Sequence, residues 1–128
     1  MTGALEDLSI AAGYWYMATP YSKSPLGLDG ACEAACLLAG ACFRRGLHVF
    51  SPIAHNHSIA VACDIDPRDN LWMNADRPMF EAAHGLLVMA MDGWRDSVGI
   101  KEEIEWAHEL KKPRFLIDPV TLTWQVFP

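Results

Sequence analysis

A short apolar run followed by a glycine-bearing loop and a helical pattern is the feature that most constrains how this chain can fold. The apolar run covers residues 85–90, the loop covers 91–97, and the helical pattern starts at Ser97. A buried strand that ends in such a loop and re-enters a helix leaves free backbone N–H groups at the carboxyl edge of a sheet. Because open α/β folds bind ligands at that edge, the segment 91–103 is the first candidate for a functional site.

Within this helical pattern, one glutamate falls on the apolar side. At about 100° per residue, Glu103 lies in the stripe that is formed by Ile100, Ile104, Ala107 and Leu110. The other glutamates of the segment, Glu102, Glu105 and Glu109, gather on the opposite face, where solvated carboxylates belong. We interpret Glu103 as a functional carboxylate. The alternative is a side chain at the edge of the stripe that reaches solvent or pairs with Arg114.

Strands and helices alternate along the rest of the chain. The patterns predict strands over 14–18, 47–50, 85–90 and 114–117, and helices over 29–45, 70–83 and 97–111. Asp29 and Ser97 are the candidate helix caps, and Pro78 is expected to kink or divide its helix. Residues 51–69 are expected to form a long irregular segment, a kind that often carries function. Residues 121–127 are expected to form a short edge strand or an arm that packs on a neighbouring subunit.

This alternation predicts a flavodoxin- or Rossmann-like three-layer α/β sandwich. We expect a parallel sheet with the strand order 2-1-3-4 and a possible fifth strand at its edge. In this order the chain reverses between the first and third strands, which opens a crevice between the loops at 19–25 and 92–99. One domain is expected over residues 1–128, because the chain is short and 52% hydrophobic.

Composition argues against several classes of function. The formal net charge of −6 disfavours a nucleic-acid binder, since phosphate-backbone binding needs a basic surface. A small anionic ligand stays open, because Lys23, Arg68, Arg77 and Arg95 lie in or beside predicted loops. Without a signal-peptide pattern or an apolar run of membrane-spanning length, we expect a cytoplasmic protein without a membrane partner. The four cysteines lack zinc or thioredoxin spacing and are expected to be reduced, and we expect neither a metal nor another cofactor.

Three groups of residues resemble the nucleoside 2-deoxyribosyltransferase superfamily. They are the segment Tyr16–Pro20, then Asp76 ahead of Ala83, and Asp92–Gly93 together with 97–103. The segments 49–57 and 93–97 look more narrowly like a small bacterial and phage branch of that superfamily whose function is uncharacterised. The resemblance covers most of the chain. It implies the same α/β fold, glycosyl chemistry and a homo-oligomer, either a dimer or a larger ring.

The resemblance also implies roles for three side chains. Glu103, four residues after Gly99, matches the glutamate that attacks the anomeric carbon of a nucleoside. Asp76 matches the aspartate that assists departure of the base, and Tyr16 matches the tyrosine that orients the nucleophile. For this chemistry Glu103 should be ionised and Asp76 should hold a proton. The plainer alternatives are that Asp76 caps or solvates a helix start and that Tyr16 only packs.

Ten further residues around the crevice are candidates for substrate binding: Thr19, Pro20, Tyr21, His55, His57, Asp92, Trp94, Arg95, Ser97 and Gly99. Thr19 departs from the glycine that is common in the superfamily, so the preference for sugar and phosphate stays open. Ser97 either caps its helix or receives a phosphate. Trp94 either stacks on a base or lies on the surface, and Arg95 either binds phosphate or is solvated.

The sequence therefore predicts an enzyme that cleaves or transfers an N-glycosidic bond. Its expected partner is a small-molecule nucleoside or nucleoside 5′-monophosphate, with water as the acceptor in a hydrolase or a second base in a deoxyribosyltransferase. The first alternative is a nucleotide-binding or sensing domain of the same fold without catalysis. The second is a metal-dependent hydrolase centred on His55 and His57, with Asp64 and Asp66 nearby.

Overall fold

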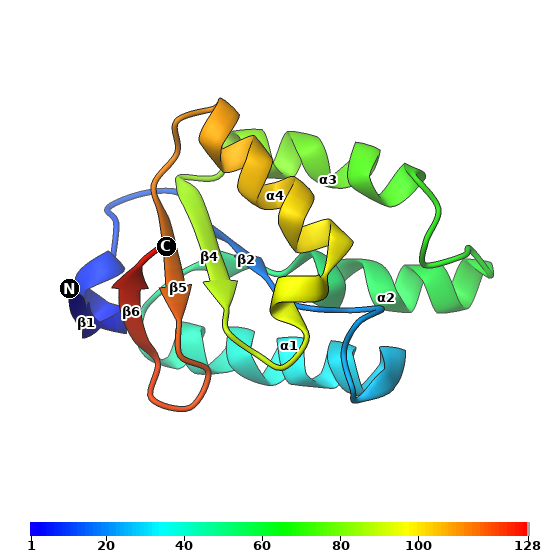
Figure 1. The fold of residues 1–128 in the computed structure, drawn as a ribbon, viewed down its shortest axis with the longest axis horizontal. Coiled ribbons are helices and arrows are strands. Elements are labelled where there is room, and N and C mark those ends of the chain that lie inside the picture. Colours follow the sequence, from blue (N-terminus) through cyan, green and yellow to red (C-terminus); the bar gives the residue numbers. More distant parts are fainter. Residues whose placement is uncertain (128) are drawn as a thin grey trace.

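Six strands form one sheet between two layers of helices (Figure 1) in the computed structural model, which describes residues 1–127. The strands are β1 (Thr2–Ala4), β2 (Trp15–Ala18), β3 (Val49–Phe50), β4 (Gly85–Met89), β5 (Arg114–Ile117) and β6 (Thr123–Val126). The helices are α1 (Gly27–Arg44), α2 (Pro52–Cys63), α3 (Leu71–Ala82) and α4 (Val98–Glu109), with short 3-10 turns η1 (Leu5–Leu8) and η2 (Trp94–Asp96). The expected α/β three-layer sandwich is confirmed.

The sheet has the order β1-β6-β5-β4-β2-β3. Strands β3, β2, β4 and β5 are parallel, which confirms the order expected for the four central strands. The sheet differs from the expectation at its other side, where β6 is antiparallel to β5 and β1 is antiparallel to β6. The expected fifth strand is therefore an internal strand. The edge strand β1 was missed because its three residues carry no hydrophobic alternation.

The alternation of side chains along β2 divides the core into two layers. Trp15 and Met17 pack in the layer that contains the small residues of α1, whereas Tyr16 and Ala18 pack beneath α3 and α4. All four side chains are buried, as is typical of a parallel strand that is covered on both faces. Figure 1 shows α1 on one side of the sheet and α3 with α4 on the other.

Helix α2 is the main correction to the predicted elements, because it occupies most of the segment that was expected to be irregular. The Ser51 side chain caps it by accepting a hydrogen bond from the backbone N–H of Ala54 at 3.1 Å, and Pro52 takes the first helical position. Its apolar residues follow no single stripe, so periodicity did not reveal it. Ser51 followed by proline was the overlooked signal.

The other helices differ from expectation only in detail. Helix α1 starts at Gly27, so Asp29 lies in its first turn and does not cap it. Helix α3 continues through Pro78 as one helix. The cap of α4 is confirmed, since the Ser97 hydroxyl accepts a hydrogen bond from the backbone N–H of Ile100 at 3.2 Å.

The loops that follow β2 and β4 touch through their backbones. Gly93 has a φ of +93°, a conformation that L side chains rarely adopt. A Cβ at this glycine would lie 2.3 Å from the carbonyl oxygen of Lys23. Only a residue without a side chain fits between the two loops.

Phe80 holds α3 to the sheet and gives a test of the packing. It is fully buried between the rings of Tyr16 and Trp106, with centroid distances of 5.0 and 5.4 Å. Phe80→Ala is expected to lower the free energy of unfolding by about 3–5 kcal/mol, because it leaves a cavity. The neighbouring control Met79→Ala removes a side chain that is 38% exposed and should cost about 0.5 kcal/mol or less. Urea denaturation of both variants measures the difference, and equal losses would contradict the packing described.

Candidate active site

A cavity of about 880 Å³ lies at the carboxyl end of β2, beside the start of α4. Its walls come from the loop after β2, from α2, from the segment 67–70 with α3, and from the first turns of α4. This is the edge of the sheet at which open α/β folds bind ligands. Both carboxylates singled out from the sequence, Asp76 and Glu103, line this cavity.

Glu103 faces the packed side of α4, as its place on the helical wheel predicts, and is only 4% exposed. No ion pair reaches its carboxyl group from any residue in the range 1–127. Burial raises the pKa of Glu103 to about 8, the nearby Asp76 adds to the rise, and the Tyr16 hydroxyl opposes it. A carboxyl group in this setting binds a proton far more readily than an exposed glutamate.

Tyr16 lies behind Glu103 on β2, with its ring fully buried against Phe80. Its hydroxyl is close enough to the Glu103 carboxyl to lower the pKa of that group. The contact falls short of hydrogen-bond distance or angle, so the hydroxyl has no full hydrogen-bond partner within the described part of the chain. Burial raises the pKa of Tyr16, and the charges of Glu103 and Asp76 raise it further, so the phenol stays protonated. Tyr16 is therefore a neutral donor aimed at the site.

Asp76 occupies the middle of α3 and is only 5% exposed, so the alternatives of a cap or a solvated side chain are wrong. The Asn56 side-chain amide, on α2, donates a hydrogen bond of 2.8 Å to Asp76 Oδ1. The Asn56 carbonyl oxygen lies 2.7 Å from His55 Nδ1. Burial raises the pKa of Asp76, while the Asn56 hydrogen bond and His55 oppose the rise. One carboxylate oxygen is thus fixed by Asn56, and the other is left for a ligand.

The pKa shifts agree with the protonation state expected from the sequence at Asp76 and differ from it at Glu103. The expected chemistry requires an ionised Glu103, whereas a pKa of about 8 favours the protonated form at neutral pH. The cause is physical: Glu103 has no cation or full hydrogen bond to stabilise a charge, whereas Asp76 has the Asn56 amide. Burial thus favours the protonated form of both carboxyl groups, and the Asn56 amide weakens that preference at Asp76.

Half of the predicted binding residues line the cavity: Thr19, Tyr21, His57, Ser97 and Gly99. The Thr19 hydroxyl is buried and has no hydrogen-bond partner among residues 1–127. The Ser97 hydroxyl is already used as the cap of α4. Gly99 permits the close approach of Met73, because a Cβ would lie 3.2 Å from the methyl carbon of that residue.

The other five predicted binding residues lie outside the cavity lining. Pro20 is buried. The His55 side chain is exposed, and its ring lies beside that of Phe50. Asp92 is exposed. The Trp94 ring packs on Phe127, with Arg95 stacked on it at 4.7 Å. Trp94 thus contacts Arg95 and Phe127, and its contact with Phe127 joins segments that are far apart in the sequence.

The metal alternative gains no support from the geometry. Within residues 1–127, no three His, Cys, Asp or Glu side chains gather in a way that could hold a metal ion. His55 and His57 lie on α2, and each bonds to a neighbouring side chain. Asp64 ends α2 in the left-handed conformation, and Asp66 binds Arg68. The four cysteines are free.

Several cavity residues were not among those predicted. Asn56 is the most consequential, because it fixes Asp76. Trp72, Met73 and Asn74 add one wall from α3. Of the four cations expected in or beside loops, Lys23 and Arg68 line the cavity, whereas Arg77 lies on α3 and pairs with Glu81 and Glu109. Recognising α2 from its Ser51 cap would have placed Asn56 and His57 on one rigid element.

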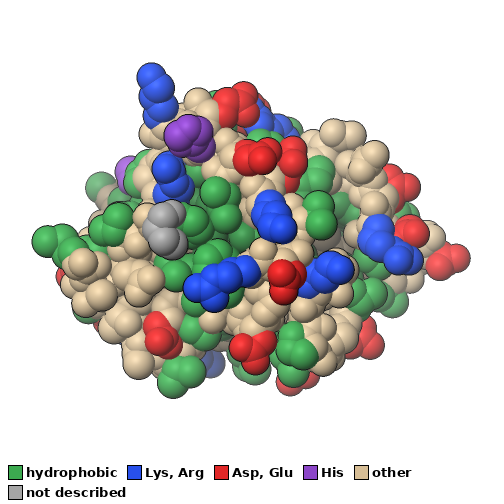
Figure 2. All heavy atoms as spheres, viewed as in Figure 1, with side chains coloured by type: hydrophobic (Ala, Val, Ile, Leu, Met, Phe, Trp, Pro, Cys, Tyr) green, Lys and Arg blue, Asp and Glu red, His purple; other side chains and the backbone are tan. Residues whose placement is uncertain are grey.

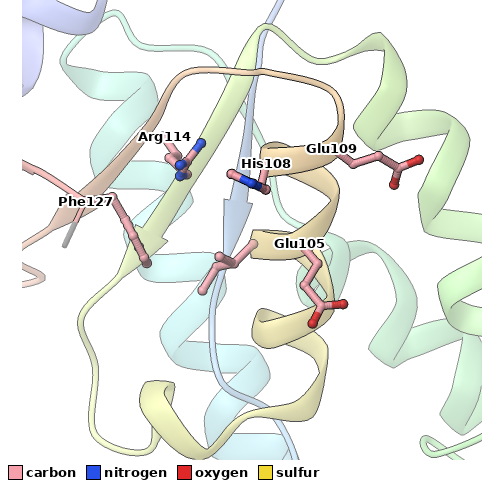
Figure 3. A pocket seen from close by; sticks show the side chains of 6 residues that line it. Glu105, His108, Glu109, Arg114 and Phe127 are labelled. Carbon is pink, nitrogen blue, oxygen red and sulfur yellow. The ribbon is translucent and has the colours of Figure 1, made fainter.

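A second, smaller groove of about 350 Å³ lies on the other side of α4 (Figure 3). It is lined by Ile104, Glu105, His108, Glu109, Arg114 and Phe127. Arg114 therefore belongs to this groove, and the alternative in which it pairs with Glu103 is wrong. Glu105 is exposed here, which makes it a matched control for Glu103 on the same helix.

Charges on the surface are mixed. On the face shown in Figure 2, Lys and Arg side chains are interspersed with Asp and Glu and form no patch of one sign. None of the helices formed by residues 1–127 has the length and apolar character needed to cross a membrane.

Fold and site together define an α/β domain with two buried carboxyl groups in a ligand cavity at the carboxyl edge of a parallel sheet. Comparison with protein families matches residues 13–118 to DUF1937, a domain of unknown function, and the chain belongs to this family. The matched range includes both carboxylates and every wall of the cavity. A comparison with curated proteins gives no match.

The raised pKa of Glu103 makes stability depend on pH. Between about pH 4.5 and 8 the native carboxyl holds a proton that the unfolded chain has lost, so stability falls as pH rises through this interval. Glu103→Gln keeps the shape and removes the titration. We expect this variant to be more stable than wild type by about 2–4 kcal/mol at pH 8, with a much smaller difference near pH 4.5.

Thermal unfolding of both proteins at the two pH values checks this expectation. Glu105→Gln, at an exposed position of the same helix, should shift the melting temperature little at either pH. If the extra stability of Glu103→Gln over wild type does not increase between pH 4.5 and pH 8, the buried carboxyl is not the cause of the pH dependence.

Proposed function

We propose that this protein cleaves or transfers the N-glycosidic bond of a nucleoside or nucleoside 5′-monophosphate. The observation that carries the proposal is the pair of buried carboxyl groups, Glu103 and Asp76, in one cavity with a neutral tyrosine hydroxyl behind Glu103. Glycosyl transfer with retention needs two such groups on either side of the bond that breaks. The resemblance to nucleoside 2-deoxyribosyltransferases, which includes the same three residues, supports the choice of a nucleoside.

In the first step, the Glu103 carboxylate attacks the anomeric carbon. The C–N bond breaks, its electron pair goes to the base nitrogen, and the proton of Asp76 neutralises the leaving base. The product is a glycosyl ester on Glu103. In the second step, water or another base attacks the same carbon, the ester bond breaks to restore the Glu103 carboxylate, and Asp76 takes the proton of the acceptor.

The working pair carries one proton, and its position matters. Burial favours a proton on Glu103, whereas the reaction needs Glu103 ionised and a proton on Asp76. The two arrangements have the same total charge and interconvert as microstates of a coupled pair. A sugar that places positive charge beside Glu103 in the transition state would favour its ionised form. The Asn56 hydrogen bond keeps Asp76 in place in either form.

Release of free base tests the proposal directly. Purified protein is incubated with the common ribo- and deoxyribonucleosides and their 5′-monophosphates, and free base is measured by chromatography. Glu103→Ala should abolish release, and Asp76→Asn should lower kcat by about 10²–10⁴-fold, the usual contribution of a general acid. Glu105→Ala, in the other groove, should behave as wild type. Release that is unchanged in Glu103→Ala would overturn the proposed role of Glu103.

The pH profile separates the roles of the two carboxyl groups. Because the working pair holds one proton, kcat/KM of the wild type should fall above about pH 8, where the second carboxyl ionises. In Asp76→Asn only Glu103 titrates, so its residual kcat/KM should rise with pH until that group is ionised. Initial rates between pH 5 and 10 measure both profiles. The same descending limb in both proteins would exclude Asp76 as the acid.

One observation favours a second candidate, a nucleotide-binding domain without catalysis. A glutamate that is protonated at neutral pH is a weak nucleophile, yet it can donate a hydrogen bond to a ligand. This candidate predicts that nucleotides raise the melting temperature without any base release, and that Glu103→Gln retains the effect. The base-release assay therefore decides between the two.

A further inference from the structure

Three hydrogen-bonded side chains join separate elements at the wall of the cavity. The Tyr21 hydroxyl, from the loop after β2, lies 2.6 Å from Nδ1 of His57 on α2. Nε2 of the same imidazole lies 2.8 Å from Oδ1 of Asp29, in the first turn of α1. Tyr21 and His57 line the cavity, and the side chain of Asp29 is 95% exposed to solvent. This series of hydrogen-bonded side chains thus runs from the cavity to the surface.

The donors and acceptors in this series of side chains fix the direction of each hydrogen bond. A carboxylate only accepts, so Nε2 of His57 carries the hydrogen that points at Asp29. In a neutral imidazole Nδ1 is then an acceptor, and the Tyr21 O–H donates to it. Burial raises the pKa of the Tyr21 phenol, with added contributions from Cys32 and Asp29, so the donated hydrogen stays in place. The hydroxyl hydrogen of Tyr21 is thus donated to His57, and the lone pairs of the Tyr21 oxygen remain able to accept a hydrogen bond.

We propose that Tyr21 determines specificity by presenting a hydrogen-bond acceptor, fixed in direction by His57 and Asp29, to an N–H or O–H donor of the substrate. A phenol hydroxyl that was free to rotate could pair with either a hydrogen-bond donor or a hydrogen-bond acceptor of the substrate. The Tyr21 hydroxyl instead discriminates against a carbonyl or phosphate oxygen at that position, because its hydrogen already points at His57. In a nucleoside the donor is either an amino group of the base or a hydroxyl of the sugar. This inference rests on the proposed function for the class of substrate.

Matched pairs of nucleosides that differ in one donor test the proposal. Adenosine is compared with purine riboside, which lacks the amino group, and with its 2′-, 3′- and 5′-deoxy forms, each of which lacks one hydroxyl. Affinities are measured by calorimetry on Glu103→Gln, which turns nothing over. One pair should show about a tenfold preference for the member with the donor, and Tyr21→Phe should remove that preference. The pair that responds identifies the source of the donor.

Two variants of His57 show whether the direction of the Tyr21 hydroxyl is set as described. The side-chain oxygen of His57→Asn can replace Nδ1 as acceptor, so the preference should persist, whereas His57→Ala should lose it. Circular dichroism and melting temperature confirm that both variants fold. A preference that is unchanged in Tyr21→Phe overturns the inference. The inference is also overturned if Tyr21→Phe lowers the affinity for every ligand by the same factor. Full preference in His57→Ala would remove His57 from its positioning role.

The affinity measurements test the role of Tyr21 independently of the base-release assay, which tests the proposed function. If the wild type releases no base but the Tyr21-dependent preference is present, the glycosyl chemistry fails and the specificity inference stands. If base is released without any dependence of the preference on Tyr21, the inference alone fails. Absence of binding by every nucleoside and every nucleoside 5′-monophosphate to both wild type and Glu103→Gln would overturn both.

Discussion

Withdrawal of the Glu103 carboxyl from water is the constraint on which the rest of the site depends. Helix α4 packs its apolar stripe on the sheet and carries this side chain with it, toward Tyr16 on β2. Because no cation from residues 1–127 meets it there, the group binds a proton that an exposed glutamate would release. The folded core therefore tolerates a polar group at a cost in stability, which is typical of residues that are kept for function.

The strands and their central order could be predicted from the sequence, because apolar runs that alternate with helical patterns leave few possible topologies. The range of β5 agrees residue for residue, and the Ser97 cap of α4 is as predicted. Helix α2 could not be found from periodicity, since its apolar residues surround the helix and its polar residues suggested a loop. The short strand β1 depends on pairing with β6, which lies at the other end of the chain.

The candidate site was predictable to the extent that it rests on local geometry. Glu103 was found from its place on a helical wheel, and Asp76 and Tyr16 from a resemblance. Asn56 was not found, because its contact with Asp76 joins two helices, and the irregular segment assigned there gave it no fixed position. The raised pKa of Glu103 was also missed, because it depends on which groups surround the carboxyl in three dimensions.

The backbone contact between Gly93 and Lys23 links the two loops that follow β2 and β4. Lys23 and Tyr21 lie on one of these loops, and the other leads directly into the turn of α4 that carries Gly99 and, one turn later, Glu103. With no side chain to act as a compressible spacer, displacement of either loop pushes directly on the main chain of the other. The loop that carries Tyr21 therefore has no room to move toward the loop that leads into the helix of the buried acid.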